Sequence, residues 1–262
     1  METQFGLAHK WNGETVEIAL KTAEGKDAQN KPGLVWLCGF RSDMDGTKAI
    51  AMVEEAEKLG CSSLRFDYSG HGSSGGVFEQ GTISRWVVES LAVFMAHTKG
   101  PQILVGSSMG AWIALRLAQL LAERAMTSRL AGLLLIAPAP DFTSRLMEPS
   151  FSEAQLQSLQ DAGFIEEPSA YSDEPNIITK ALIEDGRINQ VMSGNLTVGV
   201  PVRIVQGMQD PDVPFDHALQ LVECLAHDDV QITLVRDGDH RLSRDEDIAL
   251  LRRTIGQMVD QA

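Results

Sequence analysis

Short apolar runs alternate with longer amphipathic segments, which predicts an α/β protein with a mostly parallel, twisted sheet of about eight strands and helices on both faces. The apolar runs have the length of buried strands, and each is followed by a segment with apolar residues at helical spacing. Two alternating segments come first in the chain, and Asn12-Gly13 between them is a strong hairpin signal. We therefore expect an antiparallel N-terminal hairpin beside a parallel sheet.

The expected strands and helices follow from this pattern in chain order. The hairpin covers residues 4–11 and 14–21, and buried strands are expected over 33–38, 61–66, 102–106, 130–137, 202–206 and 230–235. Helices are expected over 46–59, 82–97, 109–125, 215–226 and 244–260. Because strand-helix-strand units connect parallel strands, the loops that follow the strands should gather at one edge of the sheet.

The alternation stops after Pro138 and resumes near Val202. Residues 139–195 contain several helical pieces and no clear strand, so we interpret them as a helical lid inserted between the core segments 1–138 and 196–262. Some of its apolar residues should pack the lid onto the core, and the others should line a binding pocket. Met147 and Phe151 are the leading pocket candidates.

Composition limits the possible partners and location. Of the 262 residues 44% are hydrophobic and 22% charged, and the formal net charge of −14 disfavours nucleic acid and anionic membrane surfaces. No apolar stretch is long enough for membrane insertion. Residues 1–20 have neither the basic and apolar regions of a signal peptide nor the Arg-rich character of a transit peptide, so we expect a cytoplasmic protein. The sequence does not indicate the oligomeric state.

The sequence predicts no metal site and no cofactor. Cys38, Cys61 and Cys224 are scattered, which is typical of reduced thiols, and neither a CxxC nor a His-x-x-His pair occurs. Asp67 and His71 could suggest a metal ligand or an acid-base pair. The glycines beside His71 instead indicate a sharp loop, and we expect Asp67 to bind loop amides.

The best nucleophile candidate is Ser108 in Gly106-Ser107-Ser108-Met109-Gly110. A predicted buried strand leads into this G-x-S-x-G motif and an apolar helix leaves it, which is the context of a nucleophile elbow. The flanking glycines remove side chains that would collide in such a sharp turn. The alternative is that the serines only cap the helix.

A serine hydroxyl needs a base that accepts its proton. His240 follows the strand 230–235 and should lie at the same sheet edge as Ser108, so it is the predicted base. His217 falls in the helix 215–226 and His227 lies near the end of that helix, so we expect both to be solvated surface or helix-end residues.

The acid that orients His240 should follow the strand 202–206. Asp210 comes first after that strand and is preferred to Asp212, which more often shapes a turn beside proline. Asp239 adjoins His240 in sequence and is expected to be a solvated loop charge, because a neighbouring side chain does not easily turn back to the imidazole.

The oxyanion of an acyl-transfer intermediate needs two backbone N–H donors. Met109, directly after the nucleophile, and Phe40, in the loop after the strand 33–38, are the predicted donors. Arg41 could bind an acidic group of the substrate, but an ion pair with Asp43 or Asp45 is the favoured interpretation.

With these motifs the chain resembles the α/β-hydrolase superfamily and, more narrowly, the family of α/β-hydrolase domain-containing protein ten and its bacterial relatives. The resemblance covers residues 39–49, 65–70, 100–110, 207–214 and 239–241, and is least in the lid. It implies an α/β-hydrolase fold, the triad Ser108, Asp210 and His240, and the activities of serine esterases and thioesterases. Activities described for that family include S-depalmitoylation of proteins and cleavage of acyl-glucuronide esters.

These observations predict a serine hydrolase that cleaves carboxylic esters or thioesters through a covalent acyl-Ser108. The substrate would be a small acyl ester or thioester, or an acylated protein. One alternative is acyl transfer or perhydrolysis by the same triad, and another is a non-catalytic, hydrolase-like binding protein. Dehalogenases and epoxide hydrolases are excluded because they need aspartate at position 108.

Overall fold

The computed structural model describes residues 4–11, 13–167 and 175–262. Within them, eight strands form one sheet in the order β1-β2-β4-β3-β5-β6-β9-β10. The strands are β1 (Gln4–Trp11), β2 (Glu14–Ala23), β3 (Gly33–Leu37), β4 (Ser63–Phe66), β5 (Gln102–Ser107), β6 (Leu130–Ile136), β9 (Val202–Gly207) and β10 (Val230–Val235). The pairs β1–β2 and β2–β4 are antiparallel and all the others are parallel, which confirms the predicted sheet.

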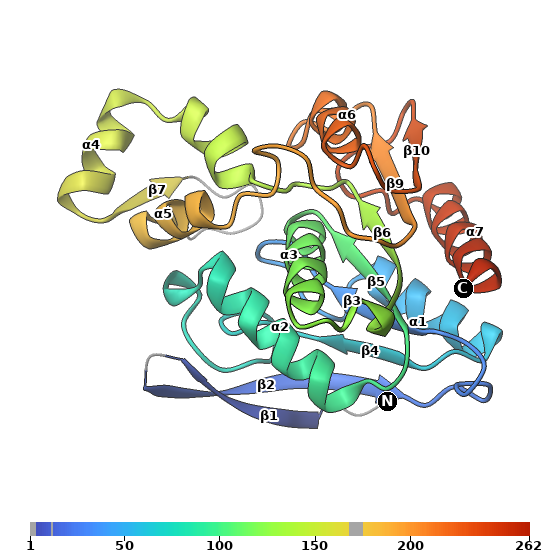
Figure 1. Ribbon diagram of the computed structural model, residues 1–262. Coiled ribbons are helices and arrows are strands. Elements are labelled where there is room, and N and C mark those ends of the chain that lie inside the picture. Colours follow the sequence, from blue (N-terminus) through green and yellow to red (C-terminus); the bar gives the residue numbers. More distant parts are fainter. Residues whose placement is uncertain (1–3, 12, 168–174) are drawn as a thin grey trace.

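Helices cover both faces of this sheet (Figure 1). The five core helices are α1 (Thr47–Leu59), α2 (Ile83–His97), α3 (Met109–Glu123), α6 (Phe215–Cys224) and α7 (Asp245–Gln261), and short 3-10 turns occur at η1 (Phe78–Gln80) and η2 (Thr127–Arg129). α1 packs with α7 on one face, and α2 packs with α3 on the other. Strands β3 and β5 are buried along their whole length, so the two helical layers meet a central apolar sheet.

The N-terminal hairpin pairs β1 with β2 in the predicted place. Asn12, half of the predicted turn signal, lies outside the described residues. Gly13 has a φ of 88°, a value that glycine adopts without the steric cost that a Cβ would add. The hairpin continues the sheet because β2 pairs antiparallel with β4.

The described residues between β6 and β9, here called the insertion, project beyond the sheet (Figure 1). It contains a π-helical turn η3 (Thr143–Met147), a 3-10 turn η4 (Glu148–Ser150), α4 (Glu153–Asp161), β7 (Phe164–Glu167), β8 (Asn176–Thr179) and α5 (Lys180–Ile188). The expectation that it holds no strand is wrong, because β7 and β8 pair antiparallel. Their inward residues Ile165 and Ile178 are paired in register and buried, which fixes this small sheet.

Five apolar side chains give the insertion its own small core: Phe151, Leu159, Ile165, Ile178 and Ile183. They come from α4, both strands, α5 and the residue after η4. Burial of these side chains supplies a local driving force for folding that does not depend on the main sheet.

The two ends of the insertion are joined by Asp141. Its carboxylate is fully buried and accepts hydrogen bonds from the backbone N–H groups of Val191, at 2.9 Å, and Met192, at 2.8 Å. Burial raises the pKa of this carboxyl group, and the two amide hydrogen bonds counteract that shift. Asp141 has a φ of 55°, a conformation that aspartate tolerates better than most residues. The insertion is thus closed at its base by a side chain rather than by strand pairing.

Among the residues that the structure describes, no helix has the length and apolar character needed to cross a bilayer.

Replacing Asp141 with alanine should lower the free energy of unfolding by about 2 to 4 kcal/mol, because two buried N–H groups lose their acceptor. Urea titration followed by circular dichroism measures this loss. Asp161→Ala, which removes an exposed carboxylate from α4, is the matched control and should change stability by less than about 0.5 kcal/mol. Equal effects of the two variants would contradict the role given to Asp141.

Candidate active site

The turn between β5 and α3 holds Ser108 in a strained conformation. Ser108 has φ 53° and ψ −119°, a region that residues with a side chain rarely occupy. The flanking glycines allow it: a Cβ at Gly106 would lie 2.4 Å from the carbonyl oxygen of Gly110, and one at Gly110 would lie 2.0 Å from that of Leu37. The motif therefore needs glycine at both positions, because backbone segments approach there too closely to leave room for a Cβ.

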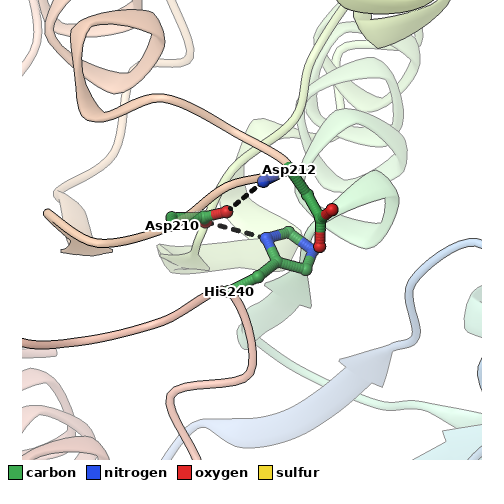
Figure 2. A group of neighbouring side chains, drawn as sticks. All are labelled: Asp210, Asp212 and His240. Carbon is green, nitrogen blue, oxygen red and sulfur yellow. Dashed lines mark hydrogen bonds and ion pairs between the residues drawn. The ribbon is translucent and has the colours of Figure 1, made fainter. Parts of the chain in front are cut away.

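His240 and Asp210 form a chain of hydrogen bonds with Ser108. His240 Nε2 lies 3.1 Å from Ser108 Oγ, and His240 Nδ1 lies 2.8 Å from Asp210 Oδ2. Figure 2 shows the bond between the imidazole and Asp210. Asp210 follows β9 and His240 follows β10, so the parallel sheet brings them to the edge where β5 delivers Ser108.

Asp210 is held by more than His240. Its Oδ1 accepts hydrogen bonds from the backbone N–H groups of Asp212, at 2.9 Å, and Val213, at 2.8 Å. Burial pushes the pKa of Asp210 upward, but the hydrogen bonds from His240 and from these amides outweigh it and lower the pKa below its usual value. Asp210 is therefore an ionised acceptor with a fixed orientation.

The loop that carries His240 is tied down on both sides. Asp239 Oδ1 accepts the backbone N–H of Leu242 at 2.9 Å, and Leu242 has a φ of 45°. Lys48, from the start of α1, donates to the carbonyl oxygen of Arg241. Burial lowers the pKa of Lys48 to about 8. Sequence analysis missed Lys48, although it lies in the stretch 39–49 that carried the family resemblance.

The loop after β3 passes directly beside Ser108. A Cβ at Gly39 would lie 3.3 Å from both the carbonyl oxygen of Ser107 and the Cβ of Ser108. Phe40 packs its ring against Phe78, with ring centroids 4.9 Å apart. Met109 is buried at the first position of α3, where backbone N–H groups have no partner within the helix. The backbones of both predicted oxyanion donors thus flank the serine.

His71 forms a hydrogen bond with the backbone of this loop. The backbone N–H of Arg41 donates to His71 Nε2 at 3.3 Å, while Nδ1 lies 3.2 Å from the carbonyl oxygen of Ser69. Burial lowers the pKa of His71 to about 4, so the ring is neutral and can accept. Sequence analysis assigned no role to His71, because only the folded loop shows the backbone group that it meets.

The ion pair expected between Arg41 and Asp43 or Asp45 is not formed in the described part of the chain. The guanidinium carbon of Arg41 lies 4.3 Å from the centroid of the Phe78 ring. Asp45 is instead paired with Lys21 and Arg65. The Arg41 side chain is exposed, next to Phe40 in the loop after β3.

Two other polar residues have structural roles. His217 is buried, and its Nε2 donates to the carbonyl oxygen of Pro140 at 2.8 Å, so the expectation that it is solvated is wrong. It connects α6 to the start of the insertion. Asp67 accepts hydrogen bonds from the backbone N–H groups of Met44, at 2.7 Å, and Ser73, at 2.8 Å, which confirms that it binds loop amides.

The proposed pocket residues in the insertion differ in their surroundings. Phe151 is buried in the small core of the insertion, where it helps to hold α4 and the β7–β8 pair together. Met147 is half-buried and contacts both this small core and the main core. Met147 is thus the one of the two that lies between the insertion and the sheet.

Asp210, Asp212 and His240 could each offer one atom to a metal ion, and these atoms lie within 4.8 Å of one another (Figure 2). The donor set does not fit well, because both ring nitrogens of His240 and both oxygens of Asp210 already have hydrogen-bond partners. A metal would have to replace the bonds that align His240 with Ser108.

The chain belongs to the α/β hydrolase family, whose model matches residues 34–251. It is 33% identical over 249 residues to the mouse mitochondrial palmitoyl-protein thioesterase ABHD10, covering 95% of this chain and 80% of that protein.

Solved structures show the same relationship. The crystal structure of a putative hydrolase from Agrobacterium vitis S4 is 52% identical, covers 98% of each chain and has a TM-score of 0.94. The structure of mouse α/β hydrolase domain-containing protein 10 is 31% identical, covers 100% of this chain and 99% of that chain, and has a TM-score of 0.85.

Proposed function

We propose that this protein is a serine hydrolase that cleaves carboxylic esters or thioesters through a covalent acyl-Ser108. The hydrogen-bonded chain from Ser108 through His240 to Asp210 carries this proposal. A carboxylate on Nδ1 holds the imidazole in the tautomer whose Nε2 accepts a proton from the serine.

Acylation follows from this geometry. Ser108 Oγ attacks the acyl carbon as its proton moves to His240 Nε2, and a tetrahedral intermediate forms. The N–H groups of Phe40 and Met109 stabilise the negative oxygen. The bond between the acyl carbon and the leaving oxygen or sulfur then breaks, and His240 gives its proton to the leaving group. In deacylation water replaces Ser108 as the nucleophile, and the proton that His240 takes from water returns to Ser108.

The acyl preference belongs to the same proposal. The similarity to palmitoyl-protein thioesterases supports thioesters of acyl groups as substrates. We propose that the insertion acts as a lid over the acyl group and that Met147 contributes to the pocket, since Met147 reaches both cores. Phe151 would act indirectly, by keeping the lid folded.

Ser108→Ala should abolish labelling by a fluorophosphonate probe and remove nearly all hydrolysis of a p-nitrophenyl ester, because no nucleophile remains. Labelling is read on a gel and hydrolysis from p-nitrophenol release. Ser107→Ala removes the neighbouring buried hydroxyl and should keep both signals. A Ser108→Ala protein that still turns over the ester would contradict the assignment.

Asp210→Asn should lower kcat by a factor on the order of 10³ to 10⁴, because the amide no longer holds the productive tautomer of His240. Asp212→Asn should cost less than about tenfold on a neutral ester, since only the backbone N–H of Asp212 bonds to Asp210. Steady-state kinetics of both variants test this order, and the reverse order would make Asp212 the acid.

The value of kcat/KM for a neutral ester should rise with pH and then level off, because His240 acts as base only when it is neutral. Asp210, with its lowered pKa, is already ionised across this range, and His71, with a pKa of about 4, is already neutral. Neither of these two groups therefore accounts for the rise. A profile that is flat between about pH 5 and 8 would exclude a histidine base.

A further inference from the structure

A second carboxylate, that of Asp212, lies close to the imidazole of His240. An oxygen of Asp212 lies within 4.8 Å of a ring nitrogen of His240, and Figure 2 shows it on the side of the ring that faces away from Asp210. That side carries Nε2, the nitrogen that faces Ser108. Asp212 therefore lies beside the reacting edge of the imidazole, while Asp210 holds the opposite edge.

The Asp212 carboxylate has no hydrogen-bond or ion-pair partner among the described residues. Its backbone N–H bonds to Asp210, which fixes the residue in the loop. The side chain is exposed. The charge is thus held in place by the backbone and is free to interact with a bound molecule.

The mechanism places the leaving group next to this charge. His240 Nε2 must donate its proton to the leaving oxygen or sulfur, so that atom lies about 3 Å from Nε2 when the bond breaks. Because Asp212 lies beside the same imidazole, substituents on the leaving atom come near its carboxylate.

We infer that Asp212 is a specificity-determining residue that makes this enzyme prefer esters and thioesters with a positively charged leaving group. This inference rests on the proposed function. A leaving group of the thiocholine type, or a cysteine thiol beside basic residues in a peptide, has the favoured charge. An anionic leaving group would be repelled. The net charge of −14 acts in the same direction but more weakly, because charges beyond about 10 Å are screened by salt.

The test uses thioesters with one acyl group and three leaving thiols: cationic thiocholine, neutral 2-mercaptoethanol and anionic 3-mercaptopropionate. Released thiol is measured with a chromogenic disulfide. The measured quantity is the ratio of kcat/KM for the cationic substrate to that for the anionic one. Because the intrinsic reactivities of the three thioesters cancel between variants, the change in this ratio reports the protein alone.

Asp212→Asn should lower this ratio about tenfold, since the interaction of one charge at about 6 Å in a wet site changes a rate by several-fold and the two substrates shift in opposite directions. Asp216→Asn removes the same charge from the exposed first turn of α6 and should leave the ratio within about twofold of the wild type. Added salt should reduce the wild-type ratio, a measurement that needs no variant.

A ratio that Asp212→Asn leaves unchanged, or that Asp216→Asn lowers equally, would overturn the inference. A wild-type ratio that does not respond to salt would also count against it. Each of these results leaves the proposed function intact, provided that the neutral thioester is hydrolysed. If none of the three thioesters and no p-nitrophenyl ester is hydrolysed, and no fluorophosphonate labels Ser108, the proposed function itself fails.

Discussion

The close approach of the β3 and β5 segments to the turn at Ser108 is the constraint on which this site depends. A Cβ at Gly110 would collide with the carbonyl oxygen of Leu37, and one at Gly106 with that of Gly110, so the turn requires glycine at both positions. The turn leaves Ser108 with a positive φ and its hydroxyl facing His240. Strain of this kind persists only where surrounding packing enforces it, and β3 and β5 are buried throughout.

The rest of the site is layered around that turn. Asp210 and the amides of its loop orient one edge of His240, while Lys48 and Asp239 hold the backbone of the histidine loop. On the other side of the serine, neutral His71 binds the loop that carries Phe40. The groups around the serine are thus held by Lys48 of α1 and by residues in the loops after β4, β9 and β10.

Sequence pattern was sufficient for what depends on chain order and periodicity. The sheet, its hairpin and its helices were predictable because buried strands and amphipathic helices leave distinct spacings. The proximity of residues 108, 210 and 240 followed from parallel strands ending at one edge. The β7–β8 pair was missed because each strand has four residues and carries charge or amide groups, so no alternation stands out.

The surroundings of His217 and Arg41 were not predictable from the local sequence. His217 has the helical position of a surface residue, yet the insertion buries it and supplies the carbonyl oxygen of Pro140. Arg41 lies near two aspartates in sequence. In the structure, however, Asp45 forms ion pairs with Lys21 and Arg65, and the guanidinium of Arg41 stacks on the Phe78 ring. These contacts join segments far apart in the chain, where local pattern carries no information about distance.

The separate small core of the insertion has a consequence for how the protein can evolve. Five side chains stabilise the insertion internally, whereas Phe142 and Leu182 pack in the main core, so changes among those five affect the sheet that bears Ser108 less directly. Under the proposed lid role, sequence changes among those five residues would alter which substrates are accepted more than they alter the triad. Grafting the segment from a relative, with Asp141 and its two amide partners kept as the junction, offers a route to new enzymes on an unchanged scaffold.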